Sequence, residues 1–134
     1  MTHFQKKNHK TNRRAMMNSV KNRVQLIGNL GAAPEMLTAE NGRKRAKMRL
    51  ATNERYTNAQ GQVVEETYWH TVIAWGPLAE VAERLTDKGT ELLVEGKLTY
   101  HEYNDKDGNP RRVTEIVVQN LLILDRKKEA ASVN

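Results

Sequence analysis

Residues 67–76 read Thr-Tyr-Trp-His-Thr-Val-Ile-Ala-Trp-Gly and contain both tryptophans of the chain. Aromatic and β-branched residues dominate this stretch, which predicts a β-strand. Successive side chains of a strand point to opposite faces, so one face carries Trp69, Thr71, Ile73 and Trp75. The two rings would lie about 20 Å apart along the strand. Such a face fits either a buried core or a surface on which two separate bases stack.

Segments before this strand show the alternation and turn residues of further strands. Residues 22–30 alternate and end in Gly28-Asn29-Leu30-Gly31, where glycine permits a close backbone approach or a bulge. Extended chain follows over residues 32–34, and Asn41-Gly42 predicts a turn. Ala46, Met48 and Leu50 alternate with Lys47, Arg49 and Ala51, which predicts a second strand with one basic face. Residues 58–62 are expected to form a polar loop.

Segments after this strand predict one helix and two strands. A proline at residue 77 suits a first helical turn, apolar residues follow at helical spacing, and Lys88-Gly89 resembles a helix end. We therefore expect a helix from Pro77 to about Asp87. Strands are expected over residues 90–103 and 112–124, joined by a hairpin tip at residues 105–110.

Three strands, a helix and two strands make an all-β chain with the layout of the OB-fold. This fold is a five-stranded Greek-key barrel, here with one short helix between the third and fourth strands. We expect the barrel to occupy residues 19–124. Residues 1–18 are predicted to be a disordered basic tail, and residues 125–134 a short flexible end.

The basic charge of the chain is concentrated in two places. The net charge is +6, but residues 1–18 hold five of the 22 basic residues and no acidic one. The first 18 residues could be a presequence, a basic arm with non-specific DNA affinity, vector-derived sequence, or the product of a misplaced start before Met16 and Met17. A second basic cluster comprises Arg43, Lys44, Arg45, Lys47, Arg49 and Arg55. It either binds phosphates or is simply the solvent-exposed side of a hairpin.

Residues typical of catalysis or metal binding are sparse. Cysteine is absent, and serine occurs only at Ser19 and Ser132. The four histidines do not have a metal-ligand spacing, and the chain lacks a Walker A loop and a GxGxxG motif. We therefore expect no catalytic residues, no metal site and no cofactor, and a chain that is not an enzyme. No apolar run reaches the roughly 20 residues of a membrane span.

Aromatic residues are instead interleaved with basic ones on the predicted strands. Stacking on aromatic rings tolerates any base, and lysines and arginines along the same groove hold the phosphate backbone. Duplex recognition would favour a recognition helix, whereas the helix expected here carries Glu80, Glu83 and Asp87. The pattern thus favours single-stranded nucleic acid.

With these features in hand, the chain resembles the bacterial single-stranded DNA-binding protein family from about Ser19 to Leu124. The resemblance rests on SVKNRVQLIGNLG at 19–31, LATNERY at 50–56 and the long run TYWHTVIAWGPLAEVAERLTDKG at 67–89. It is completed by ELLVEGKL at 91–98 and TEIVVQNLLIL at 114–124. It implies an OB-fold that assembles into homotetramers, as a dimer of dimers, and wraps single-stranded DNA.

The resemblance also implies roles for individual residues. The stacking aromatics of the family fall on Tyr56, Trp69, Trp75 and Tyr103, of which only Trp69 is the commonest family residue at its place. Phosphate contacts are expected from the 43–55 cluster, together with Arg111 and Arg112. The segment from Val20 to Leu30 resembles the part that pairs between subunits, so we expect interface residues at Val20, Asn22, Val24 and Leu26. His70 matches a family histidine at subunit contacts, and is otherwise a hydrogen-bonded strand histidine.

One departure concerns the C-terminus. Family members usually continue into a flexible tail with an acidic, apolar tip that recruits replication and repair enzymes, whereas this sequence ends at EAASVN. Recruitment by that route is therefore not expected, and a shortened paralogue from a plasmid, phage or mobile element, or a truncated form, would account for the ending.

The sequence thus predicts a cytoplasmic, nucleoid-associated bacterial protein that binds single-stranded DNA regardless of sequence. It would coat and protect single strands in replication, recombination and repair, with Trp69 and Trp75 stacking on bases. The alternative is an OB-fold adaptor of the primosome type that acts mainly through protein partners. An enzyme that processes oligonucleotides is a distant third hypothesis.

Overall fold

The computed structural model describes residues 20–124 of the chain. Its elements are β1 Val24–Leu30, β2 Glu35–Thr38, β3 Lys44–Thr57, β4 Val63–Trp75, α2 Pro77–Leu85, β5 Glu91–Asn104 and β6 Pro110–Ile123. The expected disorder of residues 1–18 and flexibility of residues 125–134 lie outside the described residues.

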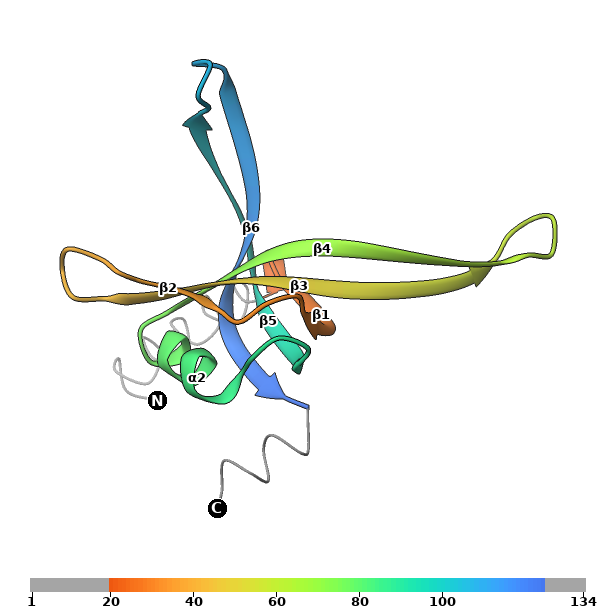
Figure 1. Cartoon of the computed structure of the whole chain (residues 1–134), viewed down its shortest axis with the longest axis horizontal. Helices are drawn as coiled ribbons and strands as arrows, with labels where there is room; N and C mark the ends of the chain where they lie inside the picture. The colour runs from red at the N-terminus through yellow and green to blue at the C-terminus, as the bar shows by residue number, and fades with distance from the viewer. Residues whose placement is uncertain (1–19, 125–134) are drawn as a thin grey trace, which may run out of the picture.

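Five of the strands close into a barrel (Figure 1). The hydrogen-bonded order is β1-β5-β6-β4-β3, and β3 returns to β1 through the pairs Asn29–Ala51 and Leu30–Leu50. The neighbours pair antiparallel except β4 and β6, which run parallel over three pairs. With α2 between β4 and β5 in the chain, the structure confirms the expected OB-fold barrel.

Gly28 lies where the backbone of β3 passes close to β1. A Cβ atom built at this position would stand 2.2 Å from the carbonyl oxygen of Ala51, which is far inside van der Waals contact. Only a glycine therefore lets the two strands meet and close the barrel. Of the two sequence-based explanations for this glycine, the close backbone approach is the one observed, and a bulge lies elsewhere, at Glu95–Gly96.

The strands differ from the prediction in number and length. The short strand β2 pairs with the start of β3, where the sequence predicted only extended chain and then a turn. That turn is present, with Gly42 at a φ of 83°. The helix ends at Leu85 rather than near Asp87, because Thr86 has already adopted extended backbone angles. The hairpin strands β3 and β4 run on to Thr57 and from Val63, well beyond the segments predicted.

The core fills the barrel and the space beneath α2. Its largest fully buried side chains are Met48, Leu50, Val72, Leu92 and Val94, and the helix contributes Ala79 and Ala82. Truncating a buried leucine to alanine typically costs about 2–5 kcal/mol, so these side chains account for much of the stability of the barrel.

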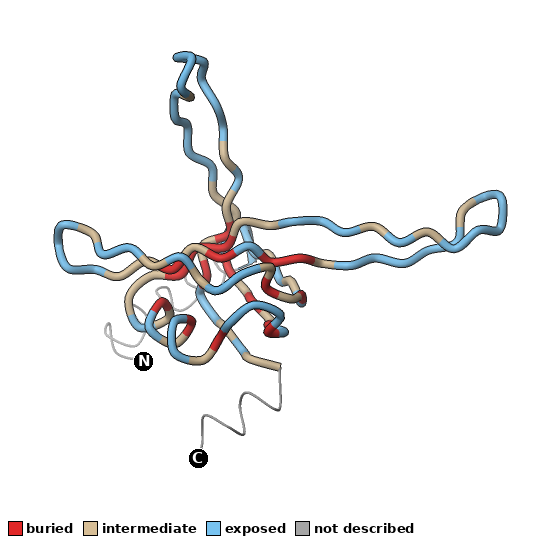
Figure 2. Tube along the Cα trace, in the orientation of Figure 1, coloured by how far each residue is buried: buried red, intermediate tan, exposed pale blue. Residues whose placement is uncertain are grey.

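The hairpins β3–β4 and β5–β6 are among those that extend beyond this core. The outer parts of β3–β4 and of β5–β6 project from the barrel in different directions, and Figure 2 shows that their outer residues are mostly exposed. A two-stranded ribbon with both faces in water gains little from burial. Aromatic side chains on these hairpins are therefore not explained by packing in the core.

Candidate nucleic-acid interface

The β3–β4 ladder decides which side chains share a surface. It runs in continuous antiparallel register from Arg45–Trp75 to Thr57–Val63. The alternation predicted for residues 67–76 is therefore unbroken along this ladder. Val72 and Ala74 point into the core, whereas Trp69 and Trp75 lie on the outer face.

Ile73 occupies the outer face between the two tryptophans. It is 3% exposed, and its cross-strand partners are Lys47 on β3 and Val117 on β6. A neighbouring strand on each side thus covers an apolar side chain that would otherwise face water. Ile73 forms an apolar floor between the rings.

Trp69 presents its ring to solvent. The side chain is 51% exposed, and the guanidinium of Arg49 lies 5.7 Å from the ring centroid. The ring also lies over Gly31, because a Cβ atom there would stand 2.6 Å from its Cζ3 atom. The glycine leaves room for the ring where the chain turns away from β1.

Trp75 repeats this arrangement at the other end of the face. It is half-buried, and the guanidinium of Arg43 lies 4.8 Å from its ring centroid. Arg45 is its cross-strand partner, and the buried Nε of Arg45 has no hydrogen-bond partner among the described residues. We call the surface formed by Trp69, Trp75, Arg43, Arg45, Lys47 and Arg49 the tryptophan face.

Two members of the predicted basic cluster are not part of the tryptophan face. Lys44 has the same strand parity as Ala46 and Met48, and its Nζ lies 3.4 Å from a carboxylate oxygen of Glu83 on α2. Arg55 is on the same side of the hairpin as Trp69 but farther out, 3.5 Å from the carboxylate of Glu65. The structure therefore brings four of the six basic residues of the cluster together with both tryptophans.

Tyr56 lies on the opposite face of the same hairpin. Its phenol donates a hydrogen bond of 2.8 Å to Oε1 of Glu66, and the phenol of Tyr68 donates to Oε2 of the same carboxylate. Glu54 is the cross-strand partner of Glu66 on this face. We call the surface formed by Tyr56, Tyr68, Glu54 and Glu66 the tyrosine face.

The hydrogen bonds of the tyrosine face shift the pKa values of its members. The hydrogen bond from Tyr68, followed by that from Tyr56, lowers the pKa of the Glu66 carboxyl group. Conversely, hydrogen bonding to Glu66 and the negative charge of this carboxylate raise the pKa of Tyr68 to about 12. The carboxylate stays ionised and the phenol stays protonated over the whole neutral range.

The β5–β6 hairpin separates the two arginines expected to hold phosphates. Arg111 is the cross-strand partner of Tyr103, and Arg112 lies on the other face with its guanidinium 4.2 Å from the ring centroid of Tyr100. Tyr103 and Tyr100 are both about half exposed. Each face of this hairpin therefore combines one exposed tyrosine with one arginine.

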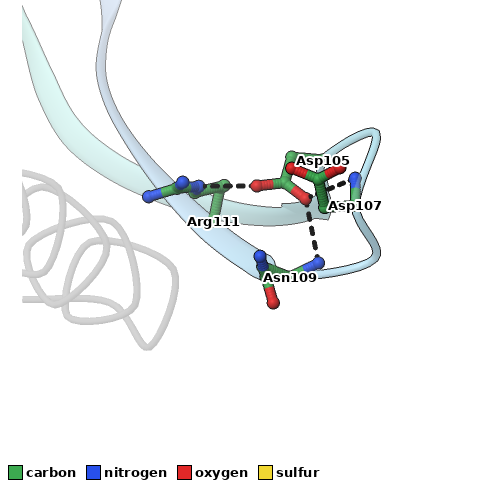
Figure 3. Close-up of polar contacts among 4 residues, drawn as sticks. All are labelled: Asp105, Asp107, Asn109 and Arg111. Carbon is green, nitrogen blue, oxygen red and sulfur yellow. Dashed lines mark hydrogen bonds and ion pairs between the residues drawn. The ribbon is translucent and has the colours of Figure 1, made fainter.

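Asp105 organises the tip of this hairpin (Figure 3). Its carboxylate accepts hydrogen bonds from the backbone N–H groups of Asp107 and Asn109, and from Nε of Arg111 at 2.9 Å. The backbone bond from Asn109 and then the bond from Arg111 lower the pKa of this carboxyl group. One edge of the Arg111 guanidinium is thus held by the turn.

Two exposed tyrosines were not among the predicted site residues. Tyr68 is adjacent to Trp69 in the sequence but points to the other face, and Tyr100 lies one strand position before His101. Strand alternation places Tyr68 away from the tryptophans, and its exposure follows from the length of the projecting hairpin, which extends to Thr57 and Val63.

The predicted interface residues lie along β1 and its surroundings. The side-chain amide of Asn22 exchanges two hydrogen bonds of 2.9 Å with the backbone of Leu98, and a ring nitrogen of His70 lies 2.9 Å from Oγ1 of Thr52. Val20 is exposed, whereas Val24 and Leu26 pack partly against the core. Within residues 20–124, Val24 to Gly28 pair only with β5, so the other backbone edge of β1 is open.

Residues 20–124 contain neither a metal-binding cluster nor a membrane-spanning helix. In this part of the chain, no group of three or more histidines and carboxylates is placed to hold a metal ion. Between residues 20 and 124, no helix has the length and apolar character needed to cross a membrane.

Comparisons with known proteins identify what this arrangement resembles. The family model described as "Single-strand binding protein family" matches residues 21–124. "Single-stranded DNA-binding protein 1" of Xylella fastidiosa is 36% identical over 81% of this chain and 80% of its own length. "Single-stranded DNA-binding protein" of Bacteroides thetaiotaomicron is 41% identical over 79% of this chain and 67% of its own length.

Solved structures give the same result. The chain from "Plasmodium falciparum SSB complex with ssDNA" superimposes with a TM-score of 0.73 at 26% identity, covering 78% of this chain and 95% of that one. A deletion mutant of the single-stranded DNA binding protein from Thermus aquaticus superimposes with a TM-score of 0.69 at 31% identity. That match covers 79% of this chain and 51% of the other.

Proposed function

The chain belongs to the single-strand binding protein family, and we propose that it binds single-stranded DNA without regard to base sequence. The observation that carries this proposal is the tryptophan face, where two outward-facing rings each lie against an arginine. Stacking is worth about 1–3 kcal/mol per base and requires only the flat face that every base has.

The arginines have a double role in this proposal. In the free protein, Arg49 and Arg43 lie against the rings of Trp69 and Trp75. A base that stacks on either ring displaces the guanidinium toward the phosphate next to that base. Arg45, whose Nε has no partner among the described residues, and Lys47 contribute further positive charge between the two rings. Binding should therefore weaken as salt rises.

The other aromatic residues extend the proposed path of the strand. Tyr56 lies on the far face of the β3–β4 hairpin, and Tyr103 lies on the β5–β6 hairpin with Arg111 beside it. A strand that stacks on all four predicted rings must leave the tryptophan face and pass around the hairpins. This geometry supports wrapping of DNA around the protein rather than a straight path across one surface.

The biological role follows from sequence-independent binding. We propose that the protein coats and protects single strands during DNA replication, recombination and repair, in the cytoplasm and at the bacterial nucleoid. Its proposed action is binding and not catalysis. The named relatives at 36% and 41% identity are single-stranded DNA-binding proteins, and they favour this role over the primosome-type adaptor.

We further propose that the protein assembles as a homotetramer, a dimer of dimers. The open edge of β1 from Val24 to Gly28 offers unpaired backbone groups to the same edge of a second copy. On the outer face, Ile27, Leu93 and Leu122 form a cross-strand apolar row, with Ile27 50% and Leu122 54% exposed. We propose that the open edge of β1 forms the interface within each dimer, and that the apolar row forms the interface between the two dimers.

Titration with oligo-dT at low salt tests the proposed function. Bases that stack on Trp69 and Trp75 should quench tryptophan fluorescence, and added salt should reverse the quenching. Absence of quenching at low salt would contradict the proposal. Light scattering with and without oligo-dT tests the assembly, because a mass of four chains is expected and a stable monomer would refute the tetramer.

A further inference from the structure

The tyrosine face carries a hydrogen-bond acceptor that sequence-independent stacking does not require. The carboxylate of Glu66 lies between two tyrosines, Tyr56 on β3 and Tyr68 on β4, and accepts one phenol hydrogen bond on each oxygen. The two tyrosine side chains are 46% and 45% exposed. An anionic acceptor therefore stands between two rings that are open to the bases of a strand.

This carboxylate retains capacity for two further hydrogen bonds. An ionised carboxylate has about four acceptor sites and no donor, and the two phenols occupy two of them. The phenol hydrogen bonds also lower the pKa of Glu66, which keeps it in this acceptor-only form. Because each oxygen has one phenol partner, the carboxylate is held in a fixed orientation with one free site on each oxygen.

The four bases differ in how well they match two acceptor sites side by side. Guanine presents adjacent N–H groups at N1 and N2, so it can donate to both oxygens at once. Thymine presents one N–H group between two carbonyl oxygens, and a carboxylate repels these oxygens. Cytosine and adenine each present an amino group beside a ring nitrogen that accepts, so they offer a donor to one oxygen only.

We propose that Glu66, positioned by Tyr56 and Tyr68, makes the tyrosine face a guanine-selective subsite within an otherwise sequence-independent surface. A guanine that stacks on either ring would donate N1–H and N2–H to the two carboxylate oxygens. The proposal rests on the proposed function, because it requires single-stranded DNA to reach this face of the hairpin.

Competition binding with matched strands tests the proposal. The probes are an oligo-dT strand, the same strand with well-separated guanines that cannot form guanine quadruplexes, and the same strand with inosine in place of guanine. A good bidentate contact discriminates by about fivefold or more. The wild-type chain should bind the guanine strand at least that much more tightly than oligo-dT, and inosine, which lacks the N2 amino group, should lose most of this gain.

Two glutamine variants separate the contact from a general effect of charge. Glu66→Gln removes one of the two acceptors, so the guanine preference should fall to near unity. Glu54→Gln removes the same charge from the opposite position on the same face, and it should keep the preference. Tyr68→Phe, which releases one oxygen of Glu66, should reduce the preference while the ring remains available for stacking.

The possible outcomes are distinct. Equal binding of the guanine and oligo-dT strands by the wild-type chain would overturn the guanine subsite and leave the proposed function intact. An equal change in both glutamine variants would overturn it as well, because charge alone would then be responsible. Failure to bind any of the three strands would instead refute the proposed function.

Discussion

The two faces of the β3–β4 hairpin carry opposite charge although they are built from alternate residues of the same two strands. The tryptophan face combines indole rings with arginines, and the tyrosine face combines phenol rings with Glu54 and Glu66. Both present exposed aromatic surface to solvent. The first is suited to phosphates beside stacked bases, whereas the second is suited to the polar edges of bases.

This difference shows how one two-stranded ribbon can carry two binding surfaces of different chemistry. Because the side-chain period of a strand is two residues, neighbours in sequence such as Tyr68 and Trp69 belong to different surfaces. A shift of one residue in the β3–β4 register would exchange the two sets of side chains. The continuous register from Arg45–Trp75 to Thr57–Val63 therefore fixes the function of each face as well as its shape.

The largest effect is expected from removing the ring of Trp69. Trp69→Ala should weaken oligo-dT binding by about 1–3 kcal/mol, because one stacking platform is lost. Its unfolding midpoint should change little, since the side chain is 51% exposed. Anisotropy of a labelled oligo-dT strand and thermal unfolding measure the two quantities.

Tyr68→Ala is the matched control for this change, since it removes a neighbouring exposed ring from the opposite face. Its oligo-dT affinity should fall much less. An equal loss in the two variants would mean that the faces are not distinct in binding, and gross unfolding of Trp69→Ala would assign the tryptophan to the core.

Removing one basic residue should weaken oligo-dT binding less than removing Trp69. The salt dependence of binding should change only when that residue lies on the tryptophan face. Arg49→Ala should lower the slope of log affinity against log salt by about 0.7, the value for one phosphate contact with a single strand. Lys44→Ala should leave the slope unchanged, because Lys44 faces Glu83 on α2. Titrations at several salt concentrations measure both, and a reduced slope for Lys44→Ala would contradict the division by strand parity.

Gly31→Ala tests the support beneath Trp69 and should have a smaller effect again. The added Cβ would stand 2.6 Å from Cζ3 of the indole, so the ring must move. We expect a shifted tryptophan emission and an oligo-dT affinity between those of the wild type and Trp69→Ala. In a Trp69→Ala background, Gly31→Ala should cause no further loss of oligo-dT affinity. If the two losses were fully additive, Gly31 would act independently of the Trp69 ring.

The barrel was predictable because its signals are local and agree with one another. Alternating residues, the Asn41-Gly42 turn and Pro77 at the helix start each specified an element that the structure contains. The extra strand β2 was missed because residues 35–38 show weak alternation, and their pairing with β3 depends on the turn at Gly42. Tertiary pairing and not local propensity makes this segment a strand.

The sequence predicts many of the residue types at the candidate site, but it predicts less well which face of the hairpin each residue occupies. Sequence placed both tryptophans on one face, and that parity is confirmed for the whole ladder. The positions of Lys44, Tyr56 and Arg112 on other faces also follow from parity, but only once the bounds of the strands are known. The hydrogen bond from Tyr56 to Glu66 could not be predicted, because it joins side chains on two strands whose register depends on the hairpin loop. Tyr68 and Glu66 share one face of β4 through strand alternation alone.

The smallest expected effect is a change in the pKa of Tyr68 on the tyrosine face, without loss of oligo-dT affinity. The phenol of Tyr68 should lose its proton near pH 12, because hydrogen bonding to Glu66 and the negative charge of this carboxylate stabilise the protonated form. Glu66→Gln removes the negative charge and replaces the charged acceptor by at most a neutral one, so the pKa should fall toward the ordinary value of 10.0. Glu54→Gln should lower it less, since Glu54 acts only through its charge and is a minor cause.

Tyrosinate absorbance during an alkaline titration measures this pKa. Subtracting the titration of Tyr68→Phe from that of the wild type isolates Tyr68 from the other tyrosines of the chain. A difference curve centred near pH 10 would show that the phenol does not donate to Glu66 in solution. The tyrosine face would then lack the fixed carboxylate that distinguishes it from the tryptophan face, and the contrast between the two faces would reduce to their net charge.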